Sequence, residues 1–179
     1  MTKKTDGKEL QKQLVWEFPN IGKEAPEQRE KAEKYCRDYK GFLNRGKTER
    51  ECVREAVRML KKAGYKPFDR KASYEPGDKV YYVNREKALI ATTFGKRPLA
   101  EGLRINGAHI DSPRLDLKPS PLYEKDEIAY FKTHYYGGLR KYQWGTSPLA
   151  IRGVVIKKNG EALTLSLGEE EDDPVLCIT

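Results

Sequence analysis

The spacing of hydrophobic and polar positions predicts helices in the first part of the chain. Apolar residues recur there with the period of amphipathic helices, over residues 24–43 and 48–64. The second helix has defined ends, because Thr48 and Glu51 form a capping box and Gly64 supplies a stop signal. Its apolar face is expected to consist of Cys52, Ala56, Met59, Leu60 and Ala63. A helical hairpin is therefore expected to precede a sheet.

From residue 78 onward the pattern favours strands. Runs rich in β-branched and aromatic residues occupy 79–84 and 88–93, and the polar triplet between them predicts a β-hairpin. A third strand is expected over 103–110, where an apolar run ends on polar residues. A fourth is expected over 127–133, followed by a turn at 135–138.

The pattern changes again beyond Trp144. Two alternating runs, at 149–156 and 162–167, flank the turn residues Lys158-Asn159-Gly160. An Asn-Gly pair between alternating runs is a strong hairpin signal. A boundary is therefore predicted near 142–148, with residues 1–145 forming an α/β unit and residues 146–179 beginning an antiparallel β unit.

The composition is that of a globular chain. Its 179 residues suffice for one domain with a core or for two small units. Neither a membrane-spanning apolar run nor a signal peptide is present, so a cytoplasmic location and no membrane partner are expected. Three cysteines, Cys36, Cys52 and Cys177, lack paired spacing, so they are expected to be reduced structural thiols.

The formal net charge of +8 raises the hypothesis of nucleic-acid binding. Residues 1–75 hold 20 Lys and Arg against 13 Asp and Glu, whereas residues 76–179 hold 15 against 14. The excess lies on predicted helices in which both signs are interleaved, which is typical of solvated helix faces. Charge alone therefore gives nucleic acid little support as a partner.

Only two histidines occur, His109 and His134, so any histidine-dependent site must use one of them. Asp111 follows His109 by two residues, and on a strand both would project from one face. A carboxylate so placed can fix the imidazole tautomer that presents a lone pair to a metal. By itself H-x-D is weak, since Asp111 capping a turn before Pro113 is the simpler interpretation. His134, among aromatic residues, is expected to be packed rather than to bind metal.

Other catalytic patterns are missing from the sequence. No G-x-S-x-G nucleophile motif occurs, and neither phosphate-loop nor dinucleotide glycine patterns occur. The acidic cluster at 169–173 precedes Pro174 and is expected to be an exposed loop.

A longer stretch around His109 resembles a known family. Residues 107–119, GAHIDSPRLDLKP, resemble the first metal-binding motif of the aspartyl aminopeptidase and vacuolar aminopeptidase I family of two-zinc metallopeptidases. Further on, Tyr136-Gly137-Gly138, Trp144 and 149–155 resemble the passage of that family into an inserted β-domain. The resemblance is strong over 106–178 and extends before residue 78 only in the helix pattern.

The resemblance implies the N-terminal part of an α/β metallopeptidase sheet domain, followed by the start of an inserted antiparallel β dimerisation domain. Such enzymes bind two zinc ions around a bridging water and remove N-terminal amino acids from peptides. By the resemblance, His109 is a zinc ligand and Asp111 is its supporting carboxylate in the catalytic site. The family's remaining ligands lie further along a longer chain, and the acidic cluster at 169–173 is not expected to replace them.

Three functions are open at this stage. The chain is expected to be the N-terminal fragment of a zinc aminopeptidase, inactive without the remainder of the enzyme, which would be its partner. Alternatively, it is a non-catalytic truncated relative that acts as an assembly module through its β-hairpin region. A basic nucleic-acid-binding protein is the third. The resemblance also implies that the chain forms a homo-oligomer.

Overall fold

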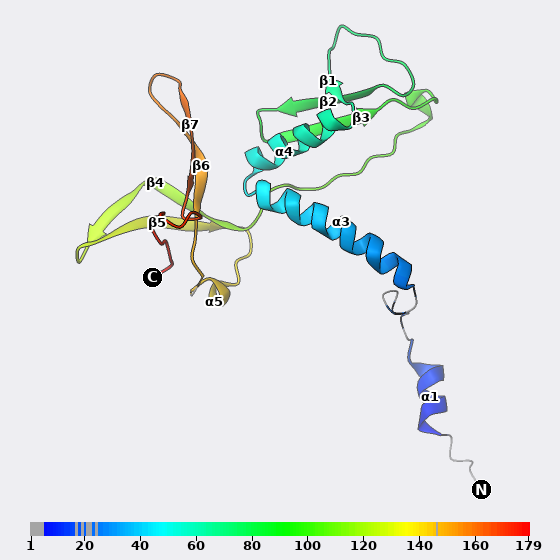
Figure 1. Cartoon of the computed structure of the whole chain (residues 1–179), viewed down its shortest axis with the longest axis horizontal. Coiled ribbons are helices and arrows are strands. Elements are labelled where there is room, and N and C mark those ends of the chain that lie inside the picture. Colours follow the sequence, from blue (N-terminus) through cyan, green and yellow to red (C-terminus); the bar gives the residue numbers. More distant parts are fainter. Residues whose placement is uncertain (1–5, 17, 19, 21–22, 24, 146) are drawn as a thin grey trace. The chain divides into compact units, whose positions relative to one another are not determined.

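The structure, a computed structural model, describes residues 6–16, 18, 20, 23, 25–145 and 147–179. The chain is mixed α/β, as expected, and its elements are drawn in Figure 1. It divides into two compact units, Met1–Gly41 and Phe42–Thr179. In chain order, the elements are α1 (Gly7–Leu14), α3 (Pro26–Arg45), α4 (Glu49–Lys62), β1 (Lys66–Pro67), β2 (Lys79–Asn84), β3 (Ala88–Thr93), η1 (Leu99–Glu101), β4 (Arg114–Lys125), β5 (Ile128–Tyr136), α5 (Lys141–Trp144), β6 (Ile151–Ile156) and β7 (Ala162–Leu167).

The first unit holds α1 and most of α3. Helix α3 confirms the helix predicted over 24–43. Helix α1 was not predicted, because its only apolar side chains, Leu10 and Leu14, share one face but form a single i, i+4 interval, too short to establish a helical period. Its first turn is capped by Asp6, whose carboxylate accepts a hydrogen bond from the backbone N–H of Lys8 over 3.3 Å.

Helix α4 lies in the second unit, which starts at Phe42 in the last turn of α3, and it confirms the predicted capping box. The Glu51 backbone N–H donates to Thr48 Oγ1 over 3.3 Å, and the Thr48 N–H donates to Glu51 Oε2 over 3.0 Å. The buried hydrophobic side chains of this unit are Cys52 and Val53 on α4 and Val80 and Tyr81 on β2, and the last two, being adjacent on a strand, lie on opposite faces of the sheet. The predicted apolar face is only partly right, because Met59 is 48% exposed and the buried Val53 was missed.

The predicted hairpin at 79–84 and 88–93 is confirmed as β2 and β3, which pair antiparallel with Tyr81 opposite Ala91. The short strand β1 adds in parallel to the other edge of β2. Lys79 and Thr93 are opposite each other in this hairpin. Lys79 Nζ donates over 3.4 Å to the carbonyl of Ala63, the C-cap of α4, and the hydroxyls of Thr93 and Tyr65 lie 2.9 Å apart.

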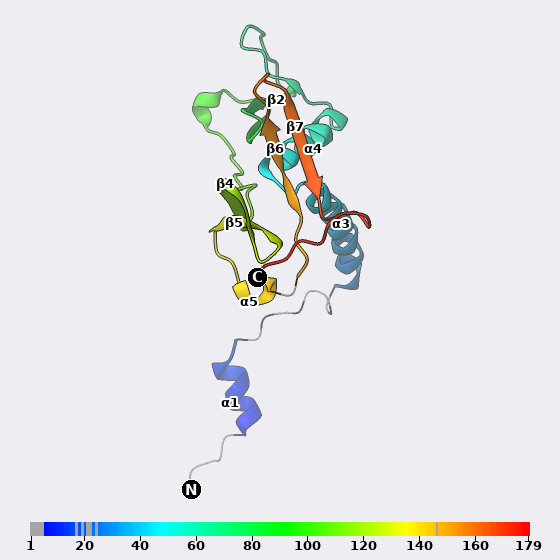
Figure 2. The same cartoon turned by 90° about the vertical axis from the view of Figure 1, so that its left-hand side faces the viewer.

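A two-stranded ribbon, β4 and β5, follows (Figure 2). Strand β5 confirms the strand predicted over 127–133, but it continues through Tyr136, so the predicted turn starts at Gly137 with φ +74°. Strand β4 was missed because Pro119 and Pro121 argue against a strand. Both prolines are accommodated because β4 has β5 as its only partner among the described strands, and the register shifts between Leu117 and Leu122.

The strand predicted over 103–110 is wrong. The segment between η1 and β4 has no strand pairing with the described part of the chain, and Leu103 and Ile105 are 66% and 82% exposed. Strand conformation requires a neighbouring strand for its backbone hydrogen bonds, which composition alone does not supply.

The hairpin predicted beyond Trp144 is confirmed as β6 and β7. Its turn closes with the Gly160 N–H donating to the Lys157 carbonyl over 2.9 Å, and Gly160 has φ +83°. An isolated bridge between Leu149 and Leu176 extends the pairing. The boundary between residues 145 and 146 stays a prediction.

The cysteines differ from one another in burial. All three cysteines are free, but Cys36 and Cys177 are exposed, so a buried structural role holds only for Cys52. Burial raises the pKa of the Cys52 thiol, which donates to the Gly46 carbonyl over 3.3 Å. Within the described residues, no helix is both long enough and apolar enough to span a bilayer.

Candidate metal site

His109 and Asp111 lie in the irregular segment that leads into β4, not at the end of a strand as predicted. The expected proximity is present: His109 Nδ1 is 3.1 Å from Asp111 Oδ1 and 3.0 Å from the Asp111 carbonyl oxygen. A carbonyl oxygen only accepts hydrogen bonds, so a neutral ring carries its hydrogen on Nδ1. The lone pair is then on Nε2, and the side chain of His109 is 83% exposed.

The second oxygen of Asp111 has a partner from another element. The hydroxyl of Tyr136, at the end of β5, donates to Asp111 Oδ2 over 2.8 Å. The bond from Tyr136 lowers the pKa of Asp111, with smaller contributions from its own backbone N–H and from His109. The same bond raises the pKa of Tyr136. The pair therefore consists of an ionised carboxylate and a protonated phenol at neutral pH.

Arg114 lies over the ring of Tyr136. The two residues are directly opposite in the β4–β5 register, and the guanidinium carbon is 4.1 Å from the ring centroid. Arg114 Nη1 donates to Glu49 Oε1 over 2.9 Å, and Nε donates to Asp116 Oδ1 over 2.7 Å. Its guanidinium is thus bound by two carboxylates and one aromatic ring.

Sequence reasoning missed Tyr136, Arg114 and Glu49 as partners of the H-x-D motif. The available signal for Tyr136 was its place in the Tyr-Gly-Gly stretch of the family resemblance. The contacts of Arg114 could not be foreseen, because they depend on the register of β4, a strand that was not predicted.

His134 is exposed, so its expected packing among aromatic residues is wrong. It lies opposite Asp116 in the ribbon, and its Nδ1 is 3.5 Å from the Tyr135 carbonyl oxygen. Within the described part of the chain, no three His, Cys, Asp or Glu side chains come together as a metal-binding group. A catalytic zinc usually has three protein ligands, so His109 fits one position of such a site and the donor set needs further residues.

The acidic cluster at 169–173 forms the exposed loop that was expected. Asp173 Oδ2 accepts the backbone N–H groups of Gly168, Glu169 and Glu170 at 2.8, 3.1 and 3.1 Å. These bonds lower the pKa of Asp173, the one from Glu170 most. Because Glu169 pairs with Arg152, two of the carboxylates in this loop already have structural partners.

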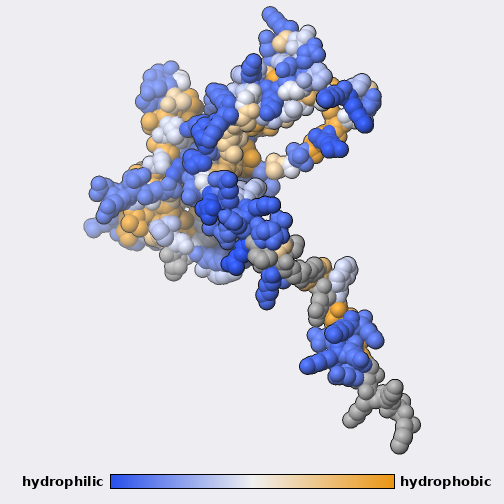
Figure 3. All heavy atoms as spheres, turned by 45° about the vertical axis from the view of Figure 1, so that its right-hand side comes forward, coloured by the Kyte–Doolittle hydropathy of each residue, from blue (hydrophilic) through white to orange (hydrophobic). Residues whose placement is uncertain are grey.

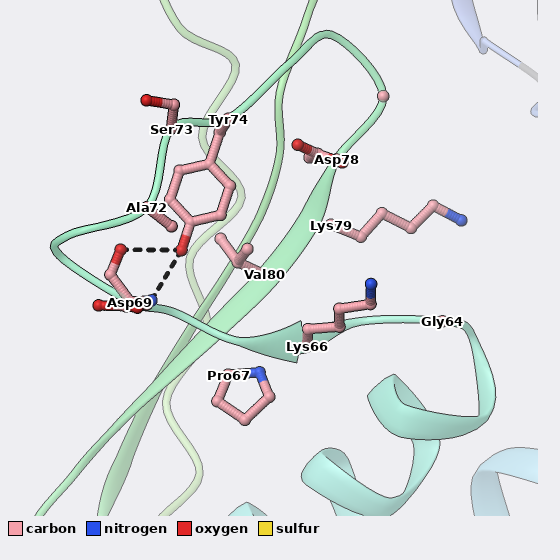
Figure 4. A pocket seen from close by; sticks show the side chains of 11 residues that line it. Gly64, Lys66, Pro67, Asp69, Ala72, Ser73, Tyr74, Asp78, Lys79 and Val80 are labelled. Carbon is pink, nitrogen blue, oxygen red and sulfur yellow. Dashed lines mark hydrogen bonds between the residues drawn. The ribbon is translucent and has the colours of Figure 1, made fainter.

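A cavity of about 380 Å³ lies elsewhere, between the end of α4, the loop after β1 and the start of β2 (Figure 4). Its lining includes Lys66, Asp69, Tyr74 and Lys79, but neither His109 nor Asp111. The Tyr74 hydroxyl accepts from the Asp69 N–H over 2.7 Å and donates to the Asp69 carbonyl over 3.0 Å. This cavity therefore contributes nothing to the candidate metal site.

The chain matches a family of zinc metalloproteases. Residues 42–179 match the family model of the Aminopeptidase I zinc metalloprotease (M18). The probable M18 family aminopeptidase 1 of Clostridium acetobutylicum is 49% identical over 145 residues, which are 79% of this chain and 31% of that protein. The same-named protein of Thermotoga neapolitana is 42% identical over 169 residues, covering 94% of this chain and 35% of that one.

Solved structures agree with the sequence match. The crystal structure of aminopeptidase I from Borrelia burgdorferi aligns with a TM-score of 0.80 at 43% identity, over 85% of this chain and 38% of that chain. The structure of aminopeptidase I from Clostridium acetobutylicum aligns with a TM-score of 0.69 at 50% identity, over 79% and 32%. The chain thus spans about a third of the length of the curated relatives it matches. It belongs to the aminopeptidase I zinc metalloprotease family.

Proposed function

We propose that this chain is the N-terminal part of a zinc aminopeptidase that removes N-terminal amino acids from peptides, with His109 as one zinc ligand. The observation that supports this role is the arrangement of the His109 ring. Its Nδ1 is held by Asp111 at 3.1 Å, while the exposed side chain leaves Nε2 accessible with its lone pair. Membership in a zinc metalloprotease family supplies the metal and the reaction class.

His109 and Asp111 would each have one role at a zinc ion. When bound, zinc lowers the pKa of a coordinated water and polarises the scissile carbonyl. His109 would hold the metal through Nε2, and the carboxylate of Asp111 would keep the hydrogen on Nδ1. We propose that the other ligands of a two-zinc site come from the remainder of a longer polypeptide, and that the 179-residue chain alone is inactive.

We also propose that residues 146–179 are the opening strands of an inserted β dimerisation domain and that the protein is a homo-oligomer. The β6–β7 hairpin exposes apolar side chains, with Ile156 at 64% and Val155 at 46% exposure, and Val175 further on is 84% exposed. Hydrophobic side chains also reach the surface on the face shown in Figure 3. Exposed apolar strands of this kind support association. The same observation favours the alternative function of a non-catalytic assembly module.

Peptidase assays separate these two functions. The zinc-loaded 179-residue chain is expected to leave aminoacyl chromogenic substrates intact, whereas the longer polypeptide hydrolyses them. Hydrolysis by the short chain would overturn the claim that it lacks ligands, and inactivity of the longer polypeptide would favour the assembly module. Light scattering tests the oligomer, and a strict monomer at high concentration would contradict it. The cytoplasmic location stays a prediction.

A further inference from the structure

We infer that Tyr136 is a positioning residue for His109, acting through Asp111, and that Arg114 and Glu49 hold Tyr136 in place. The inference rests on the proposed function, because it gives Tyr136 a role only if His109 binds metal. It adds a residue from outside the H-x-D motif to the site.

The carboxylate of Asp111 is oriented by bonds at both of its oxygens. Asp111 Oδ1 bonds His109 Nδ1 and Asp111 Oδ2 accepts from the Tyr136 hydroxyl, so both oxygens are engaged. A carboxylate held at one oxygen can still rotate about its side-chain bonds, whereas a second bond from another element fixes its plane. The motif segment has no strand pairing of its own with the described residues, so this bond ties the carboxylate to a strand, β5.

The ring of Tyr136 is in turn held by Arg114. Arg114 stacks on its ring at 4.1 Å and is bound by Glu49 Oε1 and Asp116 Oδ1. The three charged side chains, Arg114, Glu49 and Asp116, are only 25% to 35% exposed, which limits solvent screening of the ion pairs. Glu49 belongs to the first turn of α4. A continuous set of contacts therefore runs from Glu49 through Arg114, Tyr136 and Asp111 to His109.

A purely structural role for Tyr136 would stabilise the ribbon without affecting the imidazole. The two roles differ in the tautomer of His109. The Asp111 carbonyl oxygen, 3.0 Å from Nδ1, already favours hydrogen on Nδ1. If Tyr136 positions the carboxylate, its hydroxyl adds to this preference through the bond between Asp111 Oδ1 and His109 Nδ1 and so keeps the lone pair on Nε2. If it only stabilises the ribbon, its removal lowers the melting temperature and leaves the tautomer unchanged.

The test measures the His109 tautomer by long-range ¹⁵N–¹H NMR on the metal-free full chain, labelled at histidine. The spectrum contains only His109 and His134, so His134 is an internal reference. The long-range couplings distinguish the Nδ1–H tautomer of each ring from its Nε2–H tautomer. Tyr136→Phe keeps the ring beneath Arg114 and removes the hydroxyl. Tyr135→Phe is the matched control, because its hydroxyl bonds Lys141 and not Asp111.

Tyr136→Phe is expected to raise the fraction of the Nε2–H tautomer of His109 severalfold, while Tyr135→Phe leaves it unchanged. An unchanged tautomer in Tyr136→Phe would overturn the inference. Arg114→Lys gives a second variant, expected to shift the tautomer in the same direction because it removes the stacked guanidinium. In the complete protein, Tyr136→Phe should weaken zinc binding about threefold to tenfold, less than direct loss of the carboxylate partner.

The proposed function and the role inferred for Tyr136 can fail separately. If His109→Ala leaves zinc binding intact, the proposed function fails, whatever Tyr136 does. If His109→Ala removes zinc but Tyr136→Phe changes neither the tautomer nor the zinc affinity, only the inference about Tyr136 fails.

Discussion

Arg152 on β6 and Glu51 on α4 are 101 residues apart in the chain, yet Arg152 Nη1 donates to Glu51 Oε1 over 2.7 Å. The other oxygen of Glu51 accepts from the Thr48 N–H that begins α4. One carboxylate therefore caps a helix and binds the β6–β7 hairpin to it. Arg152 also pairs with Glu169. The bond to Glu169 raises the pKa of Arg152 most, and the bond to Glu51 raises it further.

The Arg152–Glu51 pair is expected to contribute measurably to stability. Its side chains are only 20% and 14% exposed, so solvent screens it weakly. A double-mutant cycle with Arg152→Gln and Glu51→Gln, followed by urea unfolding, should give a coupling of about 1–2 kcal/mol. The matched control is Arg50–Glu86, also 2.7 Å apart but with Glu86 76% exposed. Its coupling should stay below about 0.5 kcal/mol, and equal couplings would contradict the role of burial.

Glu55 should make the stability of the second unit depend on acid pH. Its side chain is 5% exposed and accepts from Arg58 and Arg45 at 2.7 Å, and these bonds, led by Arg58, lower its pKa to about 2. A folded pKa below the ordinary value near 4.3 means that the contribution is present above about pH 4.3. It is lost as the pH falls toward about 2.

Glu55→Gln should therefore destabilise the chain by about 1–2 kcal/mol at pH 7, since both arginines are about half exposed and partly screened. The difference from the unmodified chain should shrink steadily between pH 4 and pH 2 in denaturant unfolding. A difference that is constant across this range would show that Glu55 acts by packing and not by charge.

Two glycines with positive φ should respond differently to alanine. Gly168 has φ +97°, and a Cβ there would lie 2.7 Å from the Leu149 carbonyl oxygen. Gly160 has φ +83° with nothing within 4 Å of such a Cβ. Gly160→Ala should cost about 1–2 kcal/mol for the left-handed backbone alone. Gly168→Ala should cost more, because backbone must also move, and similar thermal unfolding midpoints for the two variants would contradict this clash.

Local patterns predicted the elements whose determinants are close in sequence. Thr48 and Glu51 define the start of α4 within one turn, and Asn159-Gly160 lies in the turn that joins β6 to β7. Strand β4 was missed because Pro119 argues against a strand unless one edge is unpaired. The segment 103–110 was taken for a strand because its composition fits one, although composition says nothing about a pairing partner.

In the candidate site, too, contacts between residues close in sequence could be predicted and contacts between distant residues could not. His109 and Asp111 are two residues apart, so their contact follows from the motif. Tyr136 reaches Asp111 across 25 residues, and Glu49 reaches Arg114 across 65. Both contacts depend on tertiary packing and on the β4–β5 register, which no short pattern specifies.

The supporting role proposed for Asp111 gives a graded prediction in the complete protein. Asp111→Asn keeps the side-chain shape but weakens the acceptor at His109 Nδ1, so zinc should still bind, about ten- to a hundredfold more weakly. Competition with a chelator measures this affinity. Complete loss of the metal would make Asp111 a ligand itself, and unchanged affinity would remove it from the site.

The most direct test of the central claim is the zinc content of the complete protein after replacement of each histidine of this chain. His109→Ala is compared with His134→Ala, an exposed histidine outside the motif, by elemental analysis after dialysis against a weak chelator. His109→Ala is expected to lose tight binding at one zinc together with peptidase activity, while His134→Ala keeps both. Zinc content and activity unchanged by His109→Ala would contradict the assignment of His109 as a ligand.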